Sequence, residues 1–214
     1  MPSGHPDAPH VPSYKIATED RALKKMDLYL HVKVLFGMIV GLSVAHLLKG
    51  VAGIVQHPKR FRVYWVHLVW VLFLFLYLIH FWWWEFNLAR VREWTFPLYF
   101  FVALYAVILY LLCTLFFPEQ IGEYDGFKGY FYSRRQWIFS LMAALFVADI
   151  VDTLLKGPAY FHRLGYAYDI RTAAFLILSL LAILIKRPWF HAAFAVFALL
   201  YEIAFILEMY RTIG

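Results

Sequence analysis

The sequence predicts an all-α polytopic membrane protein with six transmembrane helices. Of its 214 residues, 63% are hydrophobic and only 16% are charged, whereas about 25% of residues are charged in a typical soluble domain. The apolar residues gather in six long stretches, and none of them alternates with the period of two that is typical of barrel strands. A chain inside lipid must satisfy its own backbone hydrogen bonds, so spans that are not barrel strands are helices.

The first 32 residues precede the first span. Residues 1–16 contain Pro, His and Ser but no apolar core, so we expect a polar tail without a cleavable signal sequence. Residues 18–30 have a helical pattern, with Leu23, Met26 and Leu30 on one face. This amphipathic segment is expected either to lie in the membrane interface or to extend the first span into water.

Two three-helix halves are expected, the first over residues 33–117 and the second over 136–214. A span needs about 20 residues, and only the fifth stretch is shorter. Pro188 separates the fifth span from the sixth, because a single helix over 172–210 would be about 58 Å long. The predicted spans are 33–55, 63–84, 95–117, 136–156, 172–186 and 188–210.

Two longer connections, residues 118–135 and 157–171, combine turn signals with many aromatic residues. Tyr and Trp prefer the headgroup region of a bilayer. We therefore expect both connections there, residues 118–135 as an aromatic loop between the halves, together with the three tryptophans at 82–84.

The two halves share an internal pattern. Leu-Leu-Lys-Gly ends both the first and the fourth spans, at 47–50 and 154–157, and Arg62 and Arg171 each open the second span of a half. Since each half has three spans, the second half enters the membrane in the opposite direction from the first. The pattern predicts an inverted 3+3 repeat, which is an architecture found in many transporters.

Lysine and arginine are divided almost evenly between the two sides of this topology, with 11 on the N-terminal side and nine on the other. The positive-inside rule therefore barely orients the chain. The charged N-terminal segment favours an N-terminus inside, and an antiparallel dimer with dual insertion is the alternative. We expect a multi-pass protein of a bacterial inner membrane that forms a homo-oligomer.

Several ionisable residues lie inside the predicted spans, where charge is costly and usually faces a bundle interior or a water path. Asp149, Asp152 and Lys156 share one helical face, in an arrangement that also suits a structural ion pair. The carboxylates are predicted near the N-terminal side and the histidines near the opposite side, a distribution that suits a proton relay. The candidate ion- or proton-binding residues are Asp149, Asp152, Glu202, His46, His67 and His191.

Some of these residues have plainer interpretations. His67 and His80 lie near opposite ends of the second span, so both are expected at the membrane interface. Small residues at helical spacing predict faces where helices pack closely. The predicted packing residues are Gly37, Gly41 and Ala45 on the first span and Ala195 and Ala198 on the sixth.

The function favoured by these features is that of a proton or cation channel, or of a proton-coupled transporter. One alternative is a non-catalytic subunit or scaffold of a larger membrane complex. Another is a haem- or metal-binding membrane protein with His46, His67 and His191 as ligands. The thirteen-residue spacing of His67 and His80 places them on different faces of their helix, which disfavours haem.

Other function classes are excluded or disfavoured. The sequence contains no HExxH, GxSxG or Gly-rich phosphate loop, so we expect neither enzymatic activity nor a cofactor. The single cysteine, Cys113, excludes an intrachain disulfide and a CxxC site. The net charge of +6 comes from short basic clusters between apolar runs. Such clusters suit lipid headgroups rather than nucleic acid.

Overall fold

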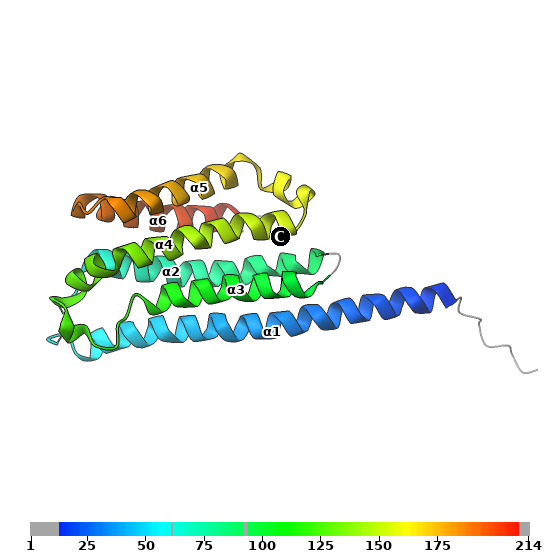
Figure 1. The fold of residues 1–214 in the computed structure, drawn as a ribbon, viewed down its shortest axis with the longest axis horizontal. Coiled ribbons are helices and arrows are strands. Elements are labelled where there is room, and N and C mark those ends of the chain that lie inside the picture. Colours follow the sequence, from blue (N-terminus) through cyan, green and yellow to red (C-terminus); the bar gives the residue numbers. More distant parts are fainter. Residues whose placement is uncertain (1–12, 61, 92–93, 210–214) are drawn as a thin grey trace, which may run out of the picture.

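The computed structural model of the chain describes residues 13–60, 62–91 and 94–209. Within these ranges six α-helices are long and apolar enough to cross a membrane, which confirms the predicted all-helical, multi-pass fold. Figure 1 shows them running along one common axis. The helices are α1 (Ser13–Gln56), α2 (Trp65–Trp84), α3 (Phe96–Thr114), α4 (Gly126–Leu155), α5 (Pro158–Leu184) and α6 (Pro188–Met209), with short 3-10 helices η1 (Glu85–Arg90) and η2 (Ile121–Glu123) in the connections.

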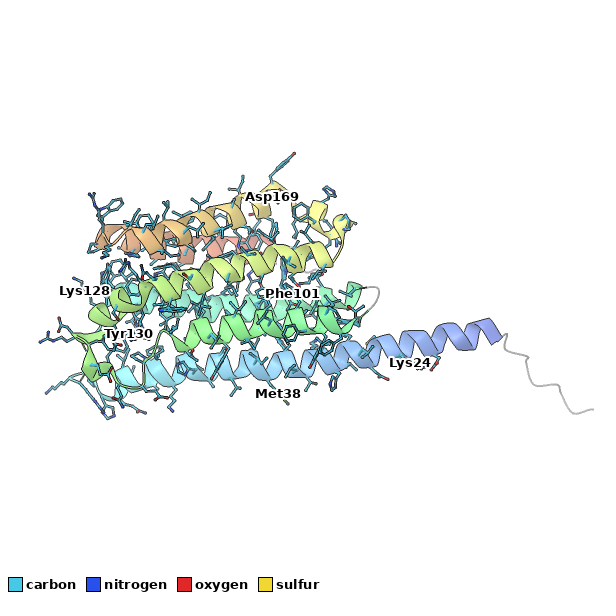
Figure 2. The ribbon with its side chains drawn as sticks, viewed as in Figure 1. Lys24, Met38, Phe101, Lys128, Tyr130 and Asp169 are labelled. Atoms are coloured by element: carbon cyan, nitrogen blue, oxygen red, sulfur yellow. The ribbon has the colours of Figure 1, made fainter. Side chains whose placement is uncertain are left out.

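Helix α1 is much longer than the bilayer requires. Its 44 residues correspond to about 66 Å, against about 30 Å for the hydrocarbon layer. Its N-terminal part projects past the other helices and carries the exposed ion pair between Lys24 and Asp20, at 3.0 Å (Figures 1 and 2). Residues 18–30 continue the first span as one unbroken helix. Residues 1–12 of the predicted polar tail lie outside the described residues.

Helix α4 begins ten residues earlier than predicted. Gly126, with φ of 69°, turns the chain into the helix inside the segment 118–135 that was expected to be an aromatic loop. Phe127, Tyr130 and Phe131 are buried on the inner face of α4. The predicted loop is therefore helical from Gly126 onward, because these aromatic residues pack inward on one helical face.

Helix α5 also begins earlier than predicted, at Pro158 instead of residue 172. The polar residues of 157–171 interrupt the apolar run, but they do not interrupt the helix except at Gly165. This residue has φ of 66° and ψ of −174°, a conformation that is essentially restricted to glycine. The break separates a short segment, 158–164, from the main part of α5.

The helices of the two halves pair differently. In the first half α1 packs mainly against α3, whereas in the second half α4 packs mainly against α5. The halves are joined by α2 on α6 and by α3 on α4. The inverted repeat stays a prediction.

The middle of the bundle is filled by an aromatic core, in which every side chain is at most 2% exposed. Phe175 stacks on Phe146 with ring centroids 4.7 Å apart, and Trp70 lies edge-on to Phe194 at 5.0 Å. Each such pair contributes about 0.5–1.5 kcal/mol beyond its burial. The aromatic core consists of Trp70 and Phe73 from α2, Phe139 and Phe146 from α4, Phe175 from α5 and Phe194 from α6.

The small residues predicted to pack have different environments. A Cβ atom at Gly37 would lie 2.8 Å from the ring of Trp82, so α1 approaches α2 closely there. Gly41 and Ala45 are exposed instead. The buried stripe of α1 runs through residues 32, 36, 40, 43 and 47, and at 100° per residue positions 41 and 45 drift away from it. On α6, Ala195 and Ala198 are fully buried in the core.

Replacing Phe175 by Ala is expected to destabilise the fold by about 3–5 kcal/mol, because a large cavity opens where four helices meet. The matched control is Phe100→Ala, since Phe100 is 58% exposed and its loss should change stability by about 0.5 kcal/mol or less. Unfolding in mixed micelles measures both changes. Equal effects of the two substitutions would contradict the central role of the aromatic core.

Candidate functional site

Seven ionisable side chains are buried together at the end of the bundle where α2, α4 and α6 finish. None of them is more than 6% exposed. They lie on one face of each helix, as Asp149, Asp152 and Lys156 do at spacings of three and four residues. We call this group the buried charge cluster: His80, Glu85, Asp149, Asp152, Lys156, Arg171 and Glu202.

Arg171 lies at the centre of the buried charge cluster. Its guanidinium donates to Glu202 at 3.3 Å, and it lies 3.9 Å from the carboxylate of Asp149. The ring of Phe205 covers it at 4.8 Å. On the other side of Glu202, the second carboxylate oxygen lies 2.6 Å from Nδ1 of His80. One cation thus links α5 to α4 and α6, and Glu202 extends the link to α2.

Asp149 is held mainly by hydroxyl groups. Tyr105 donates to its Oδ1 at 3.2 Å and Tyr168 donates to its Oδ2 at 3.0 Å. Tyr77 lies 3.3 Å from Tyr105, hydroxyl to hydroxyl, and extends this chain toward the aromatic core. The carboxylate therefore has neutral donors on two sides and shares Arg171 with Glu202.

Lys156 forms the second part of the buried charge cluster. Its ammonium donates to Glu85 at 3.0 Å and to Asp152 at 2.5 Å. Burial alone would lower the pKa of Lys156, but the two carboxylates outweigh burial and raise this pKa above its usual value. The predicted pairing of Asp152 with Lys156 is present, and Glu85 adds a second carboxylate from outside α4.

Carboxylates outnumber fixed cations in this cluster. Among the described residues it contains four carboxyl groups but only Arg171 and Lys156 as permanent positive charges. Oε2 of Glu85 and Oδ1 of Asp152 are buried without a hydrogen-bond partner. Uncompensated charge in an apolar interior is costly, so the arrangement favours the uptake of a proton or another positive charge.

A small cavity of about 10 Å³ adjoins the cluster, lined on its polar side by Tyr77, His80, Asp149 and Arg171. That volume is close to the minimum for a single water molecule. Among the described residues, no three His, Cys, Asp or Glu side chains are arranged to hold a metal ion. A cavity of this size has no room for a hydrated ion.

The predicted histidines lie at the opposite end of the bundle, as expected, but two of them are bonded to backbone carbonyls. Nε2 of His67 donates to the carbonyl of Phe116 just after α3, at 2.6 Å. Nε2 of His191 donates to the carbonyl of Ile185 just after α5, at 2.8 Å. Carbonyls at helix C-termini lack intrahelical partners, so these histidines cap α3 and α5. His46 is half-buried with its ring 6.4 Å from that of Phe117.

The structure thus brings Asp149, Asp152 and Glu202 together and separates them from the three histidines. Sequence reasoning missed three members of the cluster: His80, which was expected at the interface, Arg171, which was used only as a marker of the repeat, and Glu85. The usable sequence signal for Arg171 was Pro158, because proline is favoured in the first turn of a helix. A helix that starts there places Arg171 inside the span. A cation at that depth requires acidic partners.

Replacing a cation of the buried charge cluster should destabilise the fold far more than replacing one of its carboxylates. Arg171→Met is expected to destabilise the fold by about 3–5 kcal/mol, because it leaves Asp149 and Glu202 without their shared cation. Glu85→Gln should cost only about 1 kcal/mol, since the amide oxygen still accepts from Lys156 while the carboxylate excess falls by one. Unfolding in mixed micelles compares them. Equal losses would contradict the proposed excess of carboxylates.

The chain matches no family model, and no curated protein or solved structure is significantly similar to it.

Proposed function

We propose that the protein is a proton-coupled membrane transporter whose proton site is the buried charge cluster. The observation that carries the proposal is the presence of four buried carboxyl groups against two permanent cations. With all four ionised and His80 neutral, the cluster has a charge of −2. Protons on His80 and on one carboxyl group would neutralise it, and both groups can change protonation in the physiological range when their environment shifts them.

The contacts suggest where the protons move. His80 and Glu202 share a hydrogen bond of 2.6 Å, and the cavity beside them has room for about one water. A water there would connect His80 to Asp149. Glu85 and Asp152 each keep an unpaired oxygen beside Lys156, which provides a second place for a proton.

The aromatic core favours a transporter over an open channel. It lies between the buried charge cluster and His67, which is about 20 Å from His80 along α2. Trp70 and Phe73 occupy the intervening part of α2 and are fully buried. Protons cannot cross such a layer without a polar path, so transport requires the aromatic core to move.

The segment 158–164 is the proposed cover on the N-terminal side. Tyr160 packs on Trp84 with ring centroids 5.8 Å apart, and Trp84 lies edge-on to His80 at 5.6 Å. The break at Gly165 separates this segment from the rest of α5. Movement of the segment about Gly165 would open the cluster to water on one side only.

The finer features of the architecture are proposals as well. The inverted repeat rests on sequence matches alone, since Leu-Leu-Lys-Gly ends α4 at 154–157 but lies inside α1 at 47–50. A bacterial inner membrane, an N-terminus inside and a homo-oligomer stay part of the proposal. No contact of the described residues favours a scaffold role. A metal site of His46, His67 and His191 lacks support because, among the described residues, no three His, Cys, Asp or Glu side chains are grouped to hold a metal ion, and haem is disfavoured because His67 and His80 lie on different faces of α2.

Proton flux tests the proposal directly. Purified protein in liposomes with an internal pH dye and an imposed potassium diffusion potential should acidify the lumen only when a co-transported solute is also supplied outside, because the aromatic core closes a direct proton path. Glu202→Gln and Asp149→Asn should reduce this flux to background, because each removes a charge in contact with Arg171. Asp20→Asn, on the projecting part of α1, is the control and should transport as the wild type does. Wild-type acidification that is the same with and without every solute tested would indicate an open proton channel, and acidification equal to that of empty liposomes with every solute would overturn the proposal.

Proton occupancy can be measured without a transported substrate. Difference infrared spectroscopy across a pH step should detect the carbonyl band of a protonated carboxylic acid in the wild type. Glu85→Gln should weaken this band, since it removes one of the two carboxyl groups that share Lys156. Asp20→Asn should leave it unchanged. If the wild type lacks the carboxylic acid band at neutral pH, no carboxyl group of the cluster is protonated, and this outcome would contradict the proposed proton site.

A further inference from the structure

The two ends of the bundle differ in charge. The segments 49–62, 119–135 and 186–187 all lie at the end opposite the buried charge cluster (Figure 1). They contain nine of the 20 Lys and Arg residues but only three of the 14 acidic residues. These segments alone therefore carry +6, which equals the net charge of the whole chain.

A groove of about 280 Å³ opens at this basic end between the starts of α2 and α6. Trp65 and Trp189 are both more than half exposed along it, at 53% and 64%, and Lys128 of α4 contributes an ammonium group (Figure 2). Val66 and Ala192 line it one step deeper along the helices. The groove thus combines a cation, interfacial tryptophans and an apolar floor.

We propose that this groove binds an anionic phospholipid of the surrounding bilayer. Lys128 would contact the phosphate, Trp65 and Trp189 would flank the glycerol region, and an acyl chain would lie over Val66 and Ala192. Tryptophan rings favour this depth in a bilayer, and basic pockets between transmembrane helices attract anionic headgroups. The inference does not depend on the proposed transport function.

Local charges support an anionic occupant. Asp125, the nearest acidic residue in sequence, is paired with Arg62 at 2.6 Å, so it does not neutralise Lys128. Within the described ranges, Lys128 makes no ion pair with an acidic side chain. Helices α2 and α6 also begin at this end without an acidic residue in their first turns. Their positive dipole ends act in the same direction as Lys128.

Lipid retention tests the proposal. The full-length protein is purified in mild detergent, exchanged against mixed micelles with equal amounts of phosphatidylglycerol and phosphatidylcholine, and examined by native mass spectrometry. The wild type should retain phosphatidylglycerol preferentially. Lys128→Gln should reduce that preference about fivefold, the factor expected for one basic residue near an anionic lipid. Lys128→Arg should keep it.

Two further variants make the result decisive. Lys24→Gln makes the same charge change on the projecting part of α1, at the other end of the molecule, and should leave the preference unchanged. Trp189→Ser removes an exposed wall of the groove without touching the core, so it tests the site even if Lys128→Gln fails to fold. Equal retention of the two lipids by the wild type, or an unchanged preference in both groove variants, would overturn the proposal. Equal losses in Lys24→Gln and Lys128→Gln would show attraction by overall charge and no specific groove.

Discussion

A guanidinium buried in an apolar bundle needs acceptors around it, and this requirement organises one end of the molecule. Arg171 meets it with Glu202 on α6 and Asp149 on α4, and Glu202 holds His80 on α2. Four of the six helices are thereby fixed relative to one another through a single cation. Because lipid offers no hydrophobic force between helices, polar contacts of this kind and close packing determine how the spans associate.

The rest of the bundle follows from the separation of polar and aromatic layers. The aromatic core occupies the middle, where the rings pack against one another and only the indole N–H of Trp70 is a polar group, buried without a hydrogen-bond partner. Polar groups lie at the two ends of the bundle and form different kinds of contact at each end. At one end they form a buried cluster with surplus carboxylates, and at the other His67 and His191 cap the carbonyls that end α3 and α5. This separation places the buried cluster and the capping histidines at opposite ends of the bundle.

Much of the fold could be predicted from the sequence, because hydropathy and length suffice to define spans in a bilayer. The bounds of α2, α3 and α6 lie within a few residues of the prediction, since charged residues or proline mark their ends. The starts of α4 and α5 were missed by ten or more residues. Their early turns carry polar and aromatic side chains that resemble loop residues until neighbouring helices bury them.

The candidate site also contains some residues that the sequence predicted and others that it did not. Asp149, Asp152 and Glu202 were found from the sequence alone, because a carboxylate within an apolar run is costly wherever its helix is placed. Their partners were not found, since Arg171 and His80 are distant from them in sequence and meet them only when α2 and α5 pack against α4 and α6. The sequence by itself therefore determined the membrane class, the number of spans and which acidic groups needed compensation. Only the tertiary structure decided what compensates them, because pairing depends on distances between helices, which a local pattern does not contain.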